Sequence, residues 1–197
     1  METDDIKKLA LSIDGDIFFN KSIKNLNWFN IGGKTEIFFK PNSLKSLIEY
    51  LKLYALRGKI FILGKGSNVL FDDDIYKGTI IKLGKSFSNI TLLDKETIIA
   101  GAAVSQKKIS EFAKDHNISG LEFMSCIPGS IGGGIRMNSG CFKKEFKDVL
   151  VSLQLVDFKG IVRSIPTNKI NFNYRSIELP KDLIFLSATF KGKEKNS

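Results

Sequence analysis

The chain has 197 residues, of which 43% are hydrophobic, and this is enough to bury one full core or two small ones. Its formal net charge is +9, from 30 Lys and Arg residues against 21 Asp and Glu residues, but the lysines are scattered and form no basic block with interleaved aromatics. No helix-turn-helix, RNP or zinc pattern accompanies the charge, so a basic interaction domain is only the alternative to an enzyme, and we expect no nucleic-acid partner.

The N-terminal sequence, the apolar runs and the cysteines indicate the cellular compartment of the protein. No apolar run approaches the roughly 18 residues that a membrane span needs, and residues 1–5 are acidic where a signal peptide would be basic. Cys126 and Cys141 form no C-x-x-C pair, so neither a metal site nor a disulfide framework is expected. We therefore predict a cytoplasmic protein with no membrane partner and no metal. We also expect a monomer.

The first part of the chain alternates strand and helix patterns. A strand is expected over residues 35–40, and apolar side chains at helical spacing over residues 44–51 predict a helix after it. Residues 60–63 and 78–83 read as two further strands. We expect residues 1–84 to form a small α/β subdomain.

A second unit is expected over residues 85–197, with mixed α+β content. Residues 97–100 resemble a strand, and Ser105 can cap the helix that follows. One face of that helix is predicted to carry Ile109, Phe112, Ala113 and His116. Further strands are expected over residues 149–156, 161–165 and 183–190, the first two joined by a turn at Lys159-Gly160.

Two glycine-rich runs stand out, residues 64–68 (GKGSN) and 127–134 (IPGSIGGG). Glycine allows a positive φ and a close approach of the backbone to a ligand, so successive N–H groups can converge on an anion such as a pyrophosphate. Neither run fits G-x-G-x-x-G or a P-loop, which argues against a Rossmann domain and a nucleotide triphosphatase. The two runs predict an extended phosphate-bearing ligand.

His116 is the only histidine of the chain, and this excludes several mechanisms. A Ser-His-Asp triad needs a histidine oriented by a carboxylate, and histidine-rich metal sites need more than one. Its place in the last turn of a helix predicts a structural role, because a positive charge there suits the helix dipole.

The order of six segments resembles the UDP-N-acetylenolpyruvoylglucosamine reductase family. They are residues 27–33 (NWFNIGG), 63–68 (LGKGSN), 120–123 (GLEF), 127–133 (IPGSIGG), 137–140 (MNSG) and 174–175 (YR). The resemblance implies the two-subdomain FAD-binding fold of the vanillyl-alcohol-oxidase (PCMH) type. It also implies a flavin-dependent oxidoreductase of peptidoglycan precursor synthesis. With FAD and NADPH, such an enzyme converts UDP-N-acetylglucosamine enolpyruvate to UDP-N-acetylmuramate.

The same resemblance assigns roles to individual positions. The diphosphate cradle would consist of Gly64, Lys65, Gly66, Ser67 and Asn68. A second wall along FAD would consist of Ile127, Pro128, Gly129, Gly132 and Gly133, with Asn138, Gly140 and Cys141 completing the pocket. Tyr174 would contact the substrate, and Arg175 would be catalytic, because a planar guanidinium stabilises the negative charge that develops beside the substrate carboxylate.

Some positions depart from the family pattern. Trp28 stands where threonine is frequent, Cys126 where alanine or glycine is frequent, and Ile177 where serine commonly follows the arginine by two. The family's third domain, with its serine proton donor and a glutamate, has no counterpart after Phe190. We therefore expect the FAD-binding portion of the reductase, with a FAD-binding module without turnover as the alternative.

Overall fold

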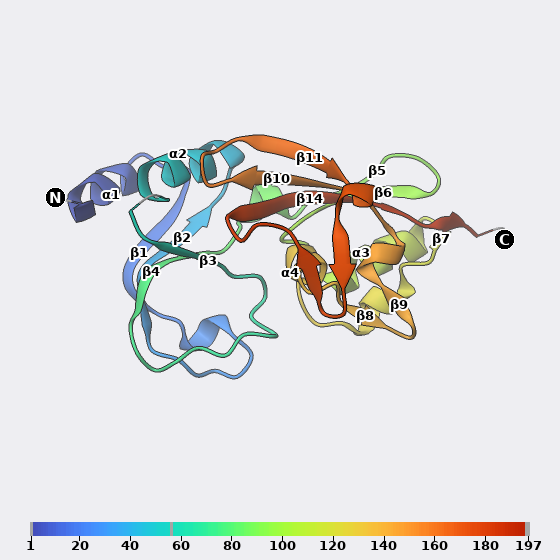
Figure 1. Cartoon of the computed structure of the whole chain (residues 1–197), viewed down its shortest axis with the longest axis horizontal. Coiled ribbons are helices and arrows are strands. Elements are labelled where there is room, and N and C mark those ends of the chain that lie inside the picture. The colour runs from blue at the N-terminus through green and yellow to red at the C-terminus, as the bar shows by residue number, and fades with distance from the viewer. Residues whose placement is uncertain (1, 56, 196–197) are drawn as a thin grey trace. The chain divides into compact units, whose positions relative to one another are not determined.

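The computed structural model describes residues 2–55 and 57–195, which divide into two compact units (Figure 1). The first unit contains residues 1–86 together with residues 158–161. The second contains residues 87–157 and 162–197. The turn at Lys159-Gly160 thus clusters with the first unit, although the strands that it joins belong to the second.

The first unit is a four-stranded sheet with helices. Its elements are α1 (Glu2–Ala10), β1 (Gly15–Ser22), β2 (Lys34–Pro41), α2 (Leu44–Tyr54), β3 (Lys59–Ile62) and β4 (Tyr76–Ile81). The strand order is β1-β2-β4-β3, with β1 antiparallel to β2 and both other pairs parallel. The expected β2, α2, β3 and β4 are confirmed, whereas β1 and α1 were not predicted.

The central strand β2 buries side chains on both faces of this sheet. Phe38 packs in a cluster with Ile23, Leu63 and Ile80, all at most 3% exposed. Its neighbour Phe39 points to the other face, because side chains alternate along a strand, and stacks on a tyrosine of α2 with ring centroids 4.4 Å apart. Such two-sided burial explains why residues 35–40 carry so many apolar side chains.

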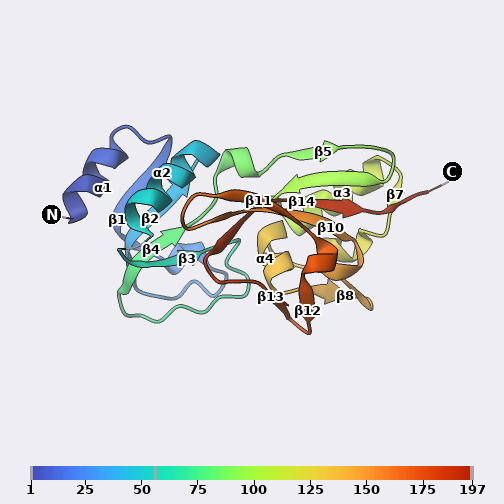
Figure 2. The ribbon, with the colours of Figure 1, turned by 45° about the horizontal axis from the view of Figure 1, so that its top comes forward.

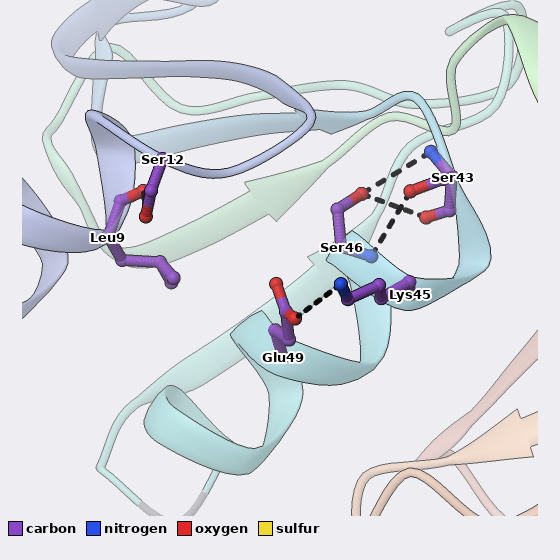
Figure 3. A network of polar contacts seen from close by, with 6 residues as sticks. All are labelled: Leu9, Ser12, Ser43, Lys45, Ser46 and Glu49. Atoms are coloured by element: carbon purple, nitrogen blue, oxygen red, sulfur yellow. Dashed lines mark hydrogen bonds and ion pairs between the residues drawn. The ribbon is translucent and has the colours of Figure 1, made fainter.

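Helix α2 has a well-defined start. The Ser43 Oγ accepts a hydrogen bond from the backbone N–H of Ser46, and the Ser46 hydroxyl accepts one from the backbone N–H of Ser43, so the two form a capping box (Figure 3). Lys45, in the first turn, forms an exposed ion pair with Glu49 of the next turn at 3.9 Å. The capping box satisfies N–H groups that a helix start otherwise leaves without partners.

The second unit is built on a five-stranded antiparallel sheet in the order β11-β10-β14-β6-β5. Its strands are β5 (Ile90–Leu92), β6 (Thr97–Gly101), β10 (Leu150–Asp157), β11 (Val162–Pro166) and β14 (Leu183–Lys191). The helices are α3 (Gln106–Asp115) and α4 (Ile131–Arg136), and the short strand β7 (Ile118–Ser119) pairs with β15 (Lys193–Glu194). No helix among residues 2–55 and 57–195 is long and apolar enough to cross a membrane.

Two small hairpins of the second unit lie near α4 (Figure 2). One pairs β8 (Gly140–Cys141) with β9 (Lys144–Glu145), and the other pairs β12 (Asn171–Asn173) with β13 (Ser176–Glu178). Each hairpin has a two-residue loop. The sequence patterns predicted neither hairpin, because their strands are too short for a periodicity to show.

Helix α3 begins after Ser105, as predicted, and the Ser105 Oγ accepts a hydrogen bond from the Lys108 N–H. Ile109 and Ala113 are buried and Phe112 is half-buried, but His116 is exposed. The imidazole stacks on the Phe112 ring and its Nδ1 lies 2.8 Å from the Phe112 carbonyl oxygen. The buried part of the predicted apolar face therefore ends at Ala113. His116 lies exposed at the C-cap of the helix.

Two adjacent glycines of α4, Gly133 and Gly134, differ in the space available for a side chain, and this difference tests the packing of the second unit. A Cβ on Gly134 would lie 2.5 Å from the Phe146 ring, whereas a Cβ on Gly133 would meet only the Ser130 Oγ, at 3.4 Å. We expect Gly134→Ala to lower the free energy of unfolding by about 1–3 kcal/mol through overpacking. Gly133→Ala is the matched control and should leave it unchanged or higher. Urea denaturation measures both, and equal stabilities would contradict the packing.

Candidate functional site

In the first unit, the glycine-rich loop after β3 packs tightly against the chain's own backbone. Gly66 has a φ of +71°, and a Cβ there would lie 2.3 Å from the Leu26 carbonyl oxygen. Within the described residues, four loop N–H groups donate no hydrogen bond to the protein, those of Gly64, Lys65, Gly66 and Asn68. The loop therefore offers backbone donors to an anion, while Gly66 itself is required by the fold.

A hydrogen-bonded turn at residues 27–31 contacts this loop. The Asn27 side chain is 4% exposed; its Nδ2 donates to the Ile31 carbonyl oxygen at 2.8 Å, and its Oδ1 accepts from the Phe29 N–H at 3.1 Å. The Trp28 N–H donates to the Gly66 carbonyl oxygen at 3.0 Å. The Trp28 and Phe29 side chains remain exposed, so the resembled segments 27–33 and 63–68 form one surface of the first unit.

In the second unit, residues 131–134 of the second glycine-rich run belong to helix α4, and residues 127–130 precede that helix. Its N–H groups are already used: those of Ile131 and Gly132 donate to carbonyl oxygens of residues 104 and 102 at 2.8 and 2.9 Å. Those of Gly133 and Gly134 donate to the side chain and the carbonyl oxygen of Ser130. The expectation that successive N–H groups of this run converge on an anion is wrong for residues 131–134, because the helix and its cap satisfy them.

Among the helical glycines of this run, Gly133 is the one that internal packing does not require. A Cβ on Gly132 would lie 3.2 Å from the Ala102 Cβ, and one on Gly134 would enter the Phe146 ring. Gly133 is exposed and has room for a Cβ. Glycine inside a helix is unfavourable, so its presence at an open site fits the close approach of a ligand such as FAD.

The buried side chain of Asn138 joins the two hairpins of the second unit. Its Nδ2 donates to the Glu145 Oε2 at 2.9 Å and to the Asn173 carbonyl oxygen at 3.2 Å. Its Oδ1 accepts from the Lys147 N–H at 3.1 Å. The residue is 1% exposed and both amide hydrogens are used within the protein. Asn138 therefore fixes the β8–β9 hairpin against the β12–β13 hairpin, while its predicted contact with FAD stays a prediction.

These two hairpins bound an open cavity of about 480 Å³. Four of the predicted site residues line it, Gly140, Cys141, Tyr174 and Arg175. The remaining lining residues were not predicted, Phe142, Lys143, Lys144, Glu145, Lys147 and Asp148. The structure thus brings together the predicted substrate residues and the end of the predicted cofactor segment in one place within the second unit.

Backbone strain concentrates at this cavity. Phe142, Lys143 and Arg175 have φ values of +53°, +62° and +56°. A non-glycine residue in this region costs about 1–2 kcal/mol, and such strain is concentrated at functional sites. The four other described non-glycine residues with positive φ are all asparagines, which tolerate it, namely Asn20, Asn30, Asn117 and Asn138.

Glu145 is the electrostatic centre of the cavity wall. The Lys147 Nζ lies 2.9 Å from the Glu145 Oε2, and hydrogen bonds from Lys147 and then Asn138 lower the pKa of the Glu145 carboxyl, with the charge of Arg175 adding to the effect. The same pair raises the pKa of the Lys147 ammonium. Sequence reasoning missed both residues, because a Lys-Glu-x-Lys stretch on a basic chain carries no distinctive pattern.

Two solved structures share this fold. MurB from Thermus caldophilus, a UDP-N-acetylenolpyruvylglucosamine reductase, matches with a TM-score of 0.78 and 24% identity, over 92% of this chain and 63% of that one. A cholesterol oxidase variant from Brevibacterium sterolicum matches with a TM-score of 0.65 and 13% identity, over 92% and 38%. These matches confirm the predicted vanillyl-alcohol-oxidase-type flavoprotein fold.

The sequence defines the family. The FAD binding domain family matches residues 35–165, and the chain belongs to it. The UDP-N-acetylenolpyruvoylglucosamine reductase of Pelagibacter ubique is 53% identical over 196 residues, and that of Rickettsia bellii is 40% identical over 185 residues. These alignments cover 100% and 94% of this chain but 65% and 61% of the relatives. The predicted resemblance to these reductases is therefore confirmed, over about two thirds of their length.

The Glu145 cluster predicts an acid dependence of stability. A carboxyl with a lowered pKa in the folded state stabilises that state above its unfolded pKa, and this contribution is lost as the pH falls through the folded pKa. We expect Glu145→Gln to destabilise the protein at pH 7 and the difference from wild type to shrink below about pH 4. Urea denaturation at pH 3–7 measures this, with Glu111→Gln, an exposed carboxylate on α3, as the control. A difference that does not change with pH would contradict the assignment.

Proposed function

We propose that this chain is the FAD-binding part of an NADPH-dependent reductase that converts UDP-N-acetylglucosamine enolpyruvate to UDP-N-acetylmuramate, in the cytoplasm, for peptidoglycan synthesis. The observation that carries the proposal is the cavity at the two hairpins, which gathers Cys141, Tyr174 and Arg175 in a chain of the FAD binding domain family. The reductases named among its relatives support the choice of reaction.

FAD fits the residues present in each unit. When bound, FAD would supply hydride transfer from NADPH to the enolpyruvyl group. In the first unit, the loop 64–68 would donate backbone N–H groups to the diphosphate. In the second unit, the open surface at Gly133 would let the cofactor approach the backbone, with Gly129, Gly140 and Cys141 nearby in the sequence.

Arg175 would bind the substrate carboxylate and stabilise the negative charge that develops beside it. The guanidinium sits at the tip of the β12–β13 hairpin over the Tyr174 ring, 5.4 Å from its centroid. A two-residue hairpin loop is short, so the backbone of Arg175 is positioned by the strands and by the Asn138 hydrogen bond to the Asn173 carbonyl oxygen. Preorganisation of this kind is what charge stabilisation requires.

A second candidate function is FAD binding without turnover. It is favoured by one observation, that the family model matching residues 35–165 is described by FAD binding alone. Flavin absorbance in the purified protein supports both candidates and would exclude a basic interaction domain. Formation of UDP-N-acetylmuramate from NADPH and UDP-N-acetylglucosamine enolpyruvate, detected by mass spectrometry, supports the reductase alone.

Gly133→Ala tests the cofactor contact. Because alanine is the better helix former, we expect the substitution to raise the stability of the FAD-free protein by up to about 1 kcal/mol. If FAD approaches this backbone, the added methyl should lower FAD affinity at least tenfold. Fluorescence titration with FAD measures affinity, and Ser110→Ala on α3 controls for helix propensity. Unchanged FAD affinity in Gly133→Ala would remove this segment from the site.

Arg175→Lys tests the catalytic assignment. Loss of one preorganised donor costs on the order of 10²–10³ in rate, and only the transfer to the substrate builds negative charge at the enolpyruvyl group. In the full-length reductase of which this chain is proposed to be a part, we expect that step to slow by this factor, while oxidation of NADPH in the absence of substrate is nearly unchanged. Stopped-flow absorbance follows both steps, with the exposed Arg57→Lys as the control. Equal slowing of both steps would show that Arg175 acts on the cofactor or on the fold instead.

A further inference from the structure

The two hairpins at the cavity share one design. Each has a two-residue tip made of an exposed aromatic residue followed by a cation with positive φ, Phe142-Lys143 in one and Tyr174-Arg175 in the other. Phe142 is 76% exposed and Tyr174 is 82% exposed. Both tips line the same cavity. The Phe142-Lys143 tip therefore has the same arrangement as the Tyr174-Arg175 tip, which we propose binds the substrate.

The conformation of the turn indicates that Phe142 and Lys143 do not stabilise the folded hairpin. A two-residue hairpin loop with positive φ at both central positions favours Asn-Gly. Apart from Arg175 in the other tip, the described left-handed non-glycine positions outside this tip are all asparagine, whereas this tip has phenylalanine and lysine. Neither side chain is buried, so no packing compensates for the strained backbone. A ligand that contacts both side chains accounts for the choice.

The charges around the cavity indicate the chemistry of that ligand. Lys147 is paired with Glu145 at 2.9 Å. Within residues 2–55 and 57–195, three other cations of the cavity make no ion pair, Lys143, Lys144 and Arg175. One substrate carboxylate would occupy Arg175 and leave both lysines. Lysine is a compact point charge that commonly binds phosphate. An exposed aromatic ring can stack on the face of a nucleotide base.

We propose that the Phe142-Lys143 tip is a second nucleotide-binding element, in which Lys143 and Lys144 bind a phosphate group and Phe142 packs on the adjoining ring. The inference rests on the proposed function, since both the UDP-sugar and NADPH carry phosphate groups. It adds to that function the residues that discriminate phosphorylated from unphosphorylated ligands. The phosphate belongs either to the uridine diphosphate or to the adenosine 2′-phosphate, and the two are separated by the probes below.

Calorimetric titration of the 197-residue chain at low salt tests the proposal, with UDP-N-acetylglucosamine and adenosine 2′,5′-bisphosphate as the probes. Lys143→Gly removes the charge and relieves the turn. We expect it to weaken binding of the recognised nucleotide at least tenfold and to leave the melting temperature unchanged or raise it by about 2–4 °C. Lys143→Arg should stay within about threefold of wild type. The control Lys181→Gly, in the exposed segment before β14, should bind like wild type.

Charge and backbone effects are separated by Lys143→Gln, which keeps a side chain at the strained position. Equal losses in Lys143→Gln and Lys143→Gly support the phosphate contact. A loss in Lys143→Gly alone would assign the effect to the backbone and overturn the proposal. It is likewise overturned if Lys143→Gly binds like wild type or if neither nucleotide binds at millimolar concentration.

The outcome is independent of the reductase assay. Flavin absorbance and product formation test the proposed function, whereas the titration measures nucleotide binding alone. Normal nucleotide binding by Lys143→Gly in a yellow, active protein refutes only the second element. Lys143-dependent binding in a protein that neither holds FAD nor forms product refutes the proposed function and leaves the second element standing.

Discussion

The buried amide of Asn138 is the contact on which the candidate substrate site depends. A buried amide must be hydrogen-bonded or it destabilises the fold, and here its three bonds go to two different hairpins and to the segment after one of them. A single side chain thus fixes the distance between two hairpin tips that are each too short to hold a position alone. The tips carry the exposed aromatic and cationic side chains of the cavity.

The scaffold behind these tips is held by Arg136, at the end of α4. Its guanidinium donates to the Leu183 carbonyl oxygen at 2.8 Å and lies 4.4 Å from the centroid of the Phe185 ring, so α4 is tied to the start of β14. Burial lowers the pKa of this guanidinium, but arginine stays charged at any pH at which the protein folds. Supports of this kind allow strained residues to persist at the cavity, because the surrounding structure determines their geometry.

The glycines of the two runs are explained by different physical constraints. Gly66 and Gly134 are required by the chain itself, since a Cβ would strike the Leu26 backbone or the Phe146 ring. Gly133 is free of such conflicts, and this makes it the informative position for cofactor binding. Glycine-rich runs in this protein therefore combine close internal packing with exposure to a ligand, and the motif by itself does not distinguish the two.

Sequence alone determined most of the long elements, though not α1 or β1, and it determined the family, because the apolar run within residues 35–40 and the helical spacing over residues 44–51 are local patterns and the six segments are collinear. It also pointed to Tyr174 and Arg175 through their resemblance to a family pair. Only the tertiary structure decided that residues 131–134 form a helix, that Asn138 joins two hairpins and that Phe142 and Lys143 face the same cavity as Arg175. The physical reason is that these features arise from side-chain contacts that reach residues up to 35 positions away and from strained backbone, which neither periodicity nor propensity encodes.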